Sequence, residues 1–133
     1  MISTTNLQRQ VPIPSSKIQS AAQKALKYLK LKNLALSIVF VGEQRMRRIN
    51  KEYLGHDYVT DVLTFEHGEI LICPAVAKRN ARRFGSSVEK ELLLYVVHGI
   101  LHLAGYDDHT PADIQKMRKK EKELLTYPPS GGV

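Results

Sequence analysis

One stretch of the sequence, from Ser87 to Ala104, is apolar on nearly every side of a helix. Ser86 stands three residues before Glu89, which is the spacing of a capping box at a helix start. The apolar side chains of the stretch are Leu92, Leu93, Leu94, Val96, Val97, Ile100, Leu101 and Leu103. Because a helix without a polar stripe is stable when buried, we predict that this one is central and that the rest of the chain packs around it.

Two histidines interrupt this apolar helix. His98 and His102 are four residues apart, so they lie on one helical face with Cβ atoms about 5–6 Å apart. Gly105 is expected to end the helix, and His109 follows on the returning chain. Three of the chain's five histidines thus fall within twelve residues. This pattern indicates an open three-ligand site for one metal ion with a fourth position for water, although an ordinary packed histidine pair is the alternative.

The remaining patterns predict an α+β fold with a small mixed sheet of about four strands and about five helices. Helices are expected at 17–31, 43–53, 74–84, 87–104 and 110–125, and strands at 34–41, 60–65 and 68–73, with a short edge strand at 6–11. Residues 66–68 are expected to join two of the strands as a hairpin. Residues 1–5 and 127–133 are predicted to be disordered tails.

The net charge and the cysteine content indicate which kind of partner and which compartment to expect. The 133-residue chain carries a formal net charge of +7, which favours a polyanionic partner and nucleic acid first. Arg45, Arg47 and Arg48 cluster on one predicted helix and could bind phosphate or form a solvated face. Cys73 is the single cysteine, so no intrachain disulfide forms, which is typical of the cytoplasm. We find no secretory signal and no apolar run long enough to span a membrane.

Three blocks of the sequence resemble one known family. Residues 98–109 (HGILHLAGYDDH) resemble the hallmark HGxLHLxGYDH of the YbeY family. Residues 50–65 (NKEYLGHDYVTDVLTF) are similar to the family segment NxxYRxKDxPTDVLSF, and residues 68–72 (GEILI) to its GDIxI strand. The first two blocks together are highly specific.

The resemblance implies a function and a set of site residues. It implies that residues 1–133 form a single metal-dependent hydrolase domain, a cytoplasmic endoribonuclease specific for single-stranded RNA. It implies zinc as cofactor, with His98, His102 and His109 as ligands. Its partners would be small-subunit ribosomal RNA and ribosomal particles, in rRNA maturation and ribosome quality control. Oligomeric state is not implied.

The chain departs from the family pattern at three positions. Asp108 occupies the usual place of the third histidine, so Asp108 is the alternative ligand to His109. Leu54 replaces an arginine implicated in the family's activity, and Val59 replaces a proline. The candidate catalytic residues are therefore Arg47 or Arg48, standing in for that arginine, and Asp107, which could orient a ligand or the water. Asp61 is either a site residue or a turn cap.

Two other functions compete with the nuclease. Zinc proteases of the HExxH type carry a glutamate after the first histidine as general base, whereas this chain has Gly99 there. A non-catalytic RNA-binding ribosome-assembly factor with a structural zinc is the second alternative, favoured by Leu54. A fourth protein ligand at the metal, such as Asp108 together with His109, would favour that structural role.

Overall fold

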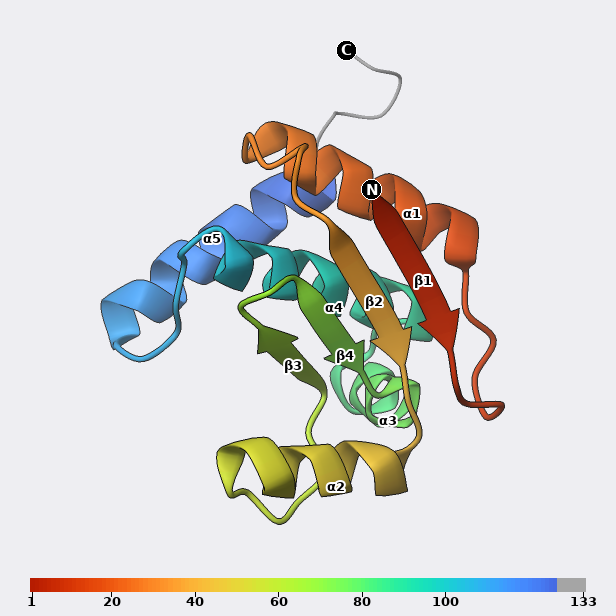
Figure 1. Cartoon of the computed structure of the whole chain (residues 1–133). Coiled ribbons are helices and arrows are strands. Elements are labelled where there is room, and N and C mark those ends of the chain that lie inside the picture. The colour runs from red at the N-terminus through yellow and green to blue at the C-terminus, as the bar shows by residue number, and fades with distance from the viewer. Residues whose placement is uncertain (127–133) are drawn as a thin grey trace.

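The computed structural model describes residues 1–126, and residues 127–133, predicted to be a tail, lie outside the described residues. The helices are α1 (Ser15–Tyr28), α2 (Glu43–Leu54), α3 (Pro74–Phe84), α4 (Val88–Leu103) and α5 (Pro111–Thr126). The strands are β1 (Ile2–Asn6), β2 (Leu36–Phe40), β3 (Val62–Phe65) and β4 (Glu69–Ile72). Within residues 1–126 the five helices and four strands confirm the predicted α+β fold (Figure 1).

The sheet is mixed and has the strand order β1-β2-β4-β3. β1, β2 and β4 run parallel, whereas β3 is antiparallel to β4 and forms one edge. The predicted hairpin over residues 60–73 is therefore confirmed. Its turn requires Gly68, whose φ is +105° and where a Cβ atom would lie 2.4 Å from the carbonyl oxygen of Ala35.

The N-terminal segment differs from the prediction. Residues 2–6 form β1, so the predicted disorder of residues 1–5 is wrong, and so is the edge strand at 6–11. β1 pairs with β2 from Ile2 opposite Leu36 to Asn6 opposite Phe40. Its sequence, ISTTN, has one large apolar side chain and thus a weak local signal. The strand exists because its backbone completes the hydrogen-bond ladder of a partner about thirty residues away, which periodicity cannot reveal.

α4 is the central helix, as predicted. Leu92, Val96 and Ile100 are fully buried in it, in the core cluster that also contains the sheet residues Ile38 and Ile70. Figure 1 shows α4 crossing behind the sheet, with α1 and α5 nearby. The helix begins after Ser87, whose Oγ accepts a hydrogen bond from the backbone N–H of Lys90, rather than after the predicted Ser86 cap.

α2 lies on the opposite face of the sheet. Met46 packs there in a second cluster with Leu63 of β3 and Leu71 of β4. The C-terminal end of α2 comes to the β3 edge, which places its last residues beside the functional site. Within residues 1–126, no helix combines the length and apolarity needed to cross a membrane.

Candidate metal centre

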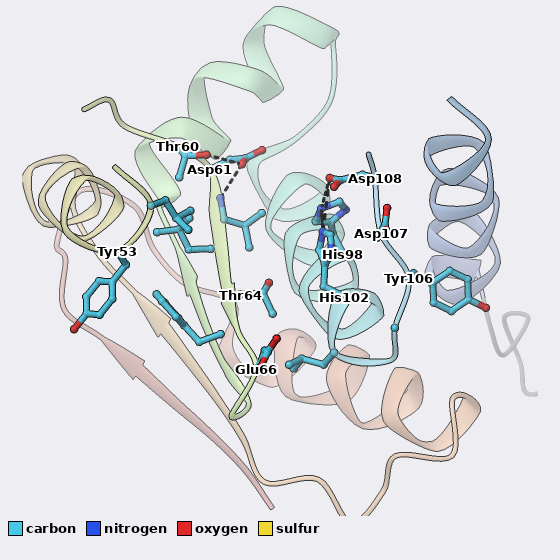
Figure 2. Close-up of a pocket in the computed structure, with 16 residues that line it drawn as sticks. Tyr53, Thr60, Asp61, Thr64, Glu66, His98, His102, Tyr106, Asp107 and Asp108 are labelled. Atoms are coloured by element: carbon cyan, nitrogen blue, oxygen red, sulfur yellow. Dashed lines mark hydrogen bonds and ion pairs between the residues drawn. The ribbon is translucent and has the colours of Figure 1, made fainter. Parts of the chain in front are cut away.

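Two α4 side chains and one loop side chain converge at the end of the central helix. The Nε2 atoms of His98 and His102 lie 3.0 Å apart. Oδ2 of Asp108, in the loop after α4, lies 3.7 Å from each of them. Figure 2 shows both imidazoles directed at the Asp108 carboxylate. Among the described residues, these three form the one His, Cys, Asp or Glu group close enough to share a metal ion.

The donor atoms fit a zinc ion in type and spacing. Imidazole nitrogen and carboxylate oxygen are common zinc ligands at about 2.0–2.2 Å, so two tetrahedral ligand atoms lie about 3.3–3.5 Å apart. The separations of 3.0 and 3.7 Å bracket this value. Three protein donors leave a tetrahedral ion one open position, which is the arrangement of catalytic rather than structural sites.

A carboxylate from α5 orients one of the imidazoles. Oε2 of Glu121 lies 2.6 Å from Nδ1 of His98, and Glu121 is 6% exposed. Since a carboxylate accepts hydrogen bonds, a neutral His98 carries its proton on Nδ1 and directs the lone pair of Nε2 toward Asp108. Glu121 could not be recognised as a site residue from the sequence, because it stands among lysines and glutamates typical of an exposed helix. Its one sequence signal is its position four residues after Met117, on the apolar stripe of α5.

The surroundings of the second imidazole lower its pKa. Burial lowers the pKa of His102, and the neighbouring His98 lowers that pKa further, against the opposing effect of Asp108. A neutral imidazole is the form that binds a metal ion. The lowered pKa therefore favours the form of His102 that can bind a metal ion.

A groove of about 870 Å³ opens in front of these three residues. β3, the edge strand, lies on one side of it, and the end of α4 with the following loop lies on the other (Figure 2). The C-terminal end of α2 completes the groove through Tyr53 and Leu54. The groove is open along the edge of the sheet, so it can accept an extended ligand.

The charges in the groove are unexpected for a basic protein. Its carboxylates belong to Asp61, Glu66, Asp107 and Asp108. Within the described chain, no lysine or arginine lines it. The positive charge of the molecule therefore lies elsewhere on the surface, and the groove itself attracts cations.

One rim of the groove is aromatic. The rings of Tyr53 and Phe65 meet edge to face with centroids 5.6 Å apart, and the side chain of Tyr53 is 67% exposed. Leu54, which stands in the place of the family arginine, lies beside them and is about half exposed. This rim offers flat apolar surface rather than charge, which suits contact with an unstacked base.

The predicted site residues divide into two groups. Asp107 lines the groove, where its Oδ1 accepts the backbone N–H of His109. His109 itself is exposed and is not among the three clustered donors. Arg47 and Arg48 line a different hollow on α2, where Arg47 donates to Asp57 at 2.8 Å and holds the pKa of that carboxyl below its usual range.

Asp61 lies in the groove across from the histidines, and it also caps a turn. Its Oδ1 accepts the backbone N–H of Val62 at 2.7 Å and the hydroxyl of Thr60 at 3.3 Å. Both roles considered from the sequence are thus compatible with its position (Figure 2).

The protease alternative lacks its general base. Gly99 follows the first histidine but points into the core, where an added Cβ would lie 2.7 Å from Cδ1 of Ile70. A side chain at this position would meet the sheet instead of a ligand in the groove. The helix geometry therefore argues against an HExxH-type mechanism.

Comparisons with known proteins agree with this architecture. The sequence model of the family described as Endoribonuclease YbeY matches residues 3–127. A protein named Endoribonuclease YbeY from Chlorobium phaeovibrioides is 39% identical over 120 residues, 85% of this chain and 81% of the relative. Another of that name from Elusimicrobium minutum is 39% identical over 123 residues, 84% of this chain and 86% of the relative. A solution structure from Thermotoga maritima has a TM-score of 0.70 at 33% identity and covers 95% of this chain and 87% of that one.

Proposed function

This chain belongs to the YbeY family, and from that premise we propose that it is a zinc-dependent endoribonuclease specific for single-stranded RNA. We propose further that it acts in the cytoplasm on small-subunit ribosomal RNA, in its maturation and in ribosome quality control. The observation that carries the activity is the set of three donor atoms, from His98, His102 and Asp108, in the wall of an open groove.

In this proposal each residue of the centre has a distinct task. His98 and His102 hold the ion through Nε2, and Asp108 supplies the third donor in place of His109, because it is the residue that already faces both imidazoles. When bound, zinc supplies Lewis acidity and an activated water for phosphodiester hydrolysis. Asp107 lies in the groove next to Asp108 and can orient that water by accepting a hydrogen bond.

The proposed single-strand specificity is supported by the shape and lining of the groove. The centre lies within the groove, between the β3 edge and the loop that carries Asp108. Bases of a single strand are free to stack on Tyr53 and Phe65 at the rim, whereas bases in a duplex are already stacked on one another. We therefore expect duplex RNA to be a poor substrate.

Zinc removal provides the direct test. We expect protein stripped with a chelator to leave a labelled single-stranded RNA of about 20 nucleotides intact. Equimolar zinc should restore its cleavage, while the same RNA annealed to its complement should remain uncut. The readout is gel separation of the products. Cleavage that survives metal removal would contradict the proposal, and zinc binding without any cleavage would favour the non-catalytic assembly factor with structural zinc.

Leu54 offers a gain-of-function test. The Leu54→Arg variant should raise kcat/KM on single-stranded RNA by about tenfold, which corresponds to about 1.4 kcal/mol of transition-state stabilisation. It adds a cation that can face an RNA phosphate in a groove that otherwise presents carboxylates. The matched control is Gln23→Arg, which adds the same charge to an exposed position of α1 outside the groove. An equal increase in both variants would attribute the gain to net charge, and a Leu54→Arg variant no faster than wild type would contradict this account of the groove.

A further inference from the structure

α3 exposes a strongly cationic face that the proposed active site does not use. Its sequence, PAVAKRNARRF, contains four basic residues and no acidic one. The side chains that it buries are the small Pro74, Ala77 and Ala81. The side chains that it exposes include Lys78, Arg79, Arg82, Arg83 and Phe84, which we call the α3 face.

Most of this charge is unpaired. Arg79 donates to Glu43 at the start of α2. In the described part of the chain, Lys78, Arg82 and Arg83 have no carboxylate within ion-pair distance. By contrast, α5 carries acidic residues among its basic ones, and its Lys120 pairs with Glu123 at 2.9 Å. Of the five helices within residues 1–126, α3 therefore has the largest excess of basic over acidic residues.

The α3 face also exposes an aromatic ring. Phe84 is 66% exposed at the end of the helix, and Cζ of Arg83 lies 5.4 Å from its centroid. A guanidinium beside an exposed aromatic ring can bind a phosphate while the ring stacks on the neighbouring base. Cations interleaved with an aromatic side chain are the combination that binds single-stranded nucleic acid.

α2 connects the α3 face with the groove. The Arg79–Glu43 ion pair joins α3 to the first residue of α2, and Leu54 at the last residue lines the groove. Twelve helical residues span about 18 Å. Arg45 and Arg48 are exposed along this span, and neither has an ion-pair partner among residues 1–126. An RNA strand leaving the groove along α2 would thus meet cations until it reached α3.

We propose that the α3 face binds the part of a single-stranded RNA substrate that extends beyond the groove. The proposal rests on the proposed nuclease function and answers a need that the groove creates. The groove contains four carboxylates and, within the described residues, no lysine or arginine, so the phosphates outside it must supply most of the electrostatic attraction. The α3 face acts as an anchor, which makes affinity depend on RNA length.

The test compares two double variants on two RNA lengths. In zinc-loaded protein, Arg82→Gln with Arg83→Gln should weaken binding of a single-stranded RNA of about 20 nucleotides by about tenfold, and lower the slope of log affinity against log salt by about 1.4. Lys24→Gln with Lys27→Gln removes the same charge from α1 and should leave this binding unchanged. Stopped-flow fluorescence anisotropy measures binding before cleavage begins.

Phe84→Ala should weaken binding without changing the slope of log affinity against log salt, because it removes stacking and no charge.

A short RNA separates this inference from the proposed function. Binding and zinc-dependent cleavage of an RNA of about 5 nucleotides, which the groove alone can hold, should be the same in wild type and in the α3 double variant. Equal losses in the α3 and α1 variants, or no loss in either, would overturn the inference while leaving the nuclease intact. Failure of wild type to cleave the short or the long RNA would instead overturn the proposed function. Loss of binding to anionic vesicles alone in the α3 variant would assign the face to lipid and also overturn the inference.

Discussion

The His102→Ala variant should lose zinc binding and RNA cleavage together. His102 supplies one of three donor atoms, and its Nε2 lies 3.0 Å from that of His98. Removing a ligand should lower the zinc affinity by more than the roughly 10–100-fold that follows loss of a residue hydrogen-bonded to a ligand. Wild type should gain about 2.7 kcal/mol of unfolding free energy when free zinc is about 100 times its Kd, and the variant should gain none. Metal analysis, thermal unfolding with and without zinc, and RNA cleavage measure the three effects.

The control for this variant is His56→Ala. His56 is an exposed histidine that stacks on Tyr58 and lies outside the groove, so its loss should leave zinc stoichiometry unchanged. His102 is half buried at the end of α4, and alanine is a strong helix former, so far-ultraviolet circular dichroism should show an intact fold. Retained zinc and cleavage in His102→Ala would exclude the proposed centre.

The same measurements choose between the two candidates for the third ligand. Asp108→Ala should lower zinc affinity and cleavage as His102→Ala does, because its carboxylate faces both imidazoles at 3.7 Å. His109→Ala should retain both, since His109 is exposed and outside the cluster of donors. Loss of zinc binding in His109→Ala but not in Asp108→Ala would identify His109 as the third ligand, as the resemblance implied. Equal losses would indicate a closed site and a structural zinc.

The Glu121→Gln variant should bind zinc about 10–100-fold more weakly, with a matching loss of cleavage at limiting zinc. Glu121 lies 2.6 Å from Nδ1 of His98 and is buried, so it orients the ring and directs Nε2 into the site. Glutamine keeps the shape and can still accept a hydrogen bond through its amide oxygen, but it removes the charge. Competition with a fluorescent zinc chelator measures the affinity.

Glu123→Gln is the matched control for Glu121→Gln. Glu123 stands two residues later on α5 and pairs with Lys120 at the surface. Its substitution removes the same charge without touching His98, so zinc affinity should stay at the wild-type value. A high zinc concentration should restore cleavage in Glu121→Gln, because the variant lowers the zinc affinity and leaves the three donor residues in place. A Glu121→Gln variant with wild-type affinity would show that the contact does not position His98.

Most of the fold could be predicted because its signals are local. The apolar periodicity of the 87–104 segment, the proline at the start of α3 and the turn at residues 66–68 each act over a few residues. The predicted helices and the β3–β4 hairpin therefore agree with the structure within a few residues. β1 was missed because its five residues, mostly small and polar, become a strand by pairing with β2. That pairing joins segments about thirty residues apart, and its hydrogen bonds belong to the backbone rather than to a side-chain pattern.

The site was predictable to the same local extent. Helical geometry by itself brings together the side chains of His98 and His102, so their pairing was evident from a spacing of four. The loop after α4 has no such repeat, and whether Asp108 or His109 faces the helix depends on how that loop packs. Arg47 and Arg48 were candidates by composition, yet both line a hollow outside the groove, where Arg47 donates to Asp57.

The central helix and its paired imidazoles follow from contacts within a few residues, so both could be predicted from the sequence. The tertiary structure alone decided that Glu121, 23 residues after His98, lies buried against it, and that Asp108 faces both histidines. It also decided that the groove is acidic while, within residues 1–126, exposed arginines without a carboxylate partner lie on α2 and α3. These properties depend on how separate helices and strands pack against one another, and the residue spacing within one segment does not determine that packing.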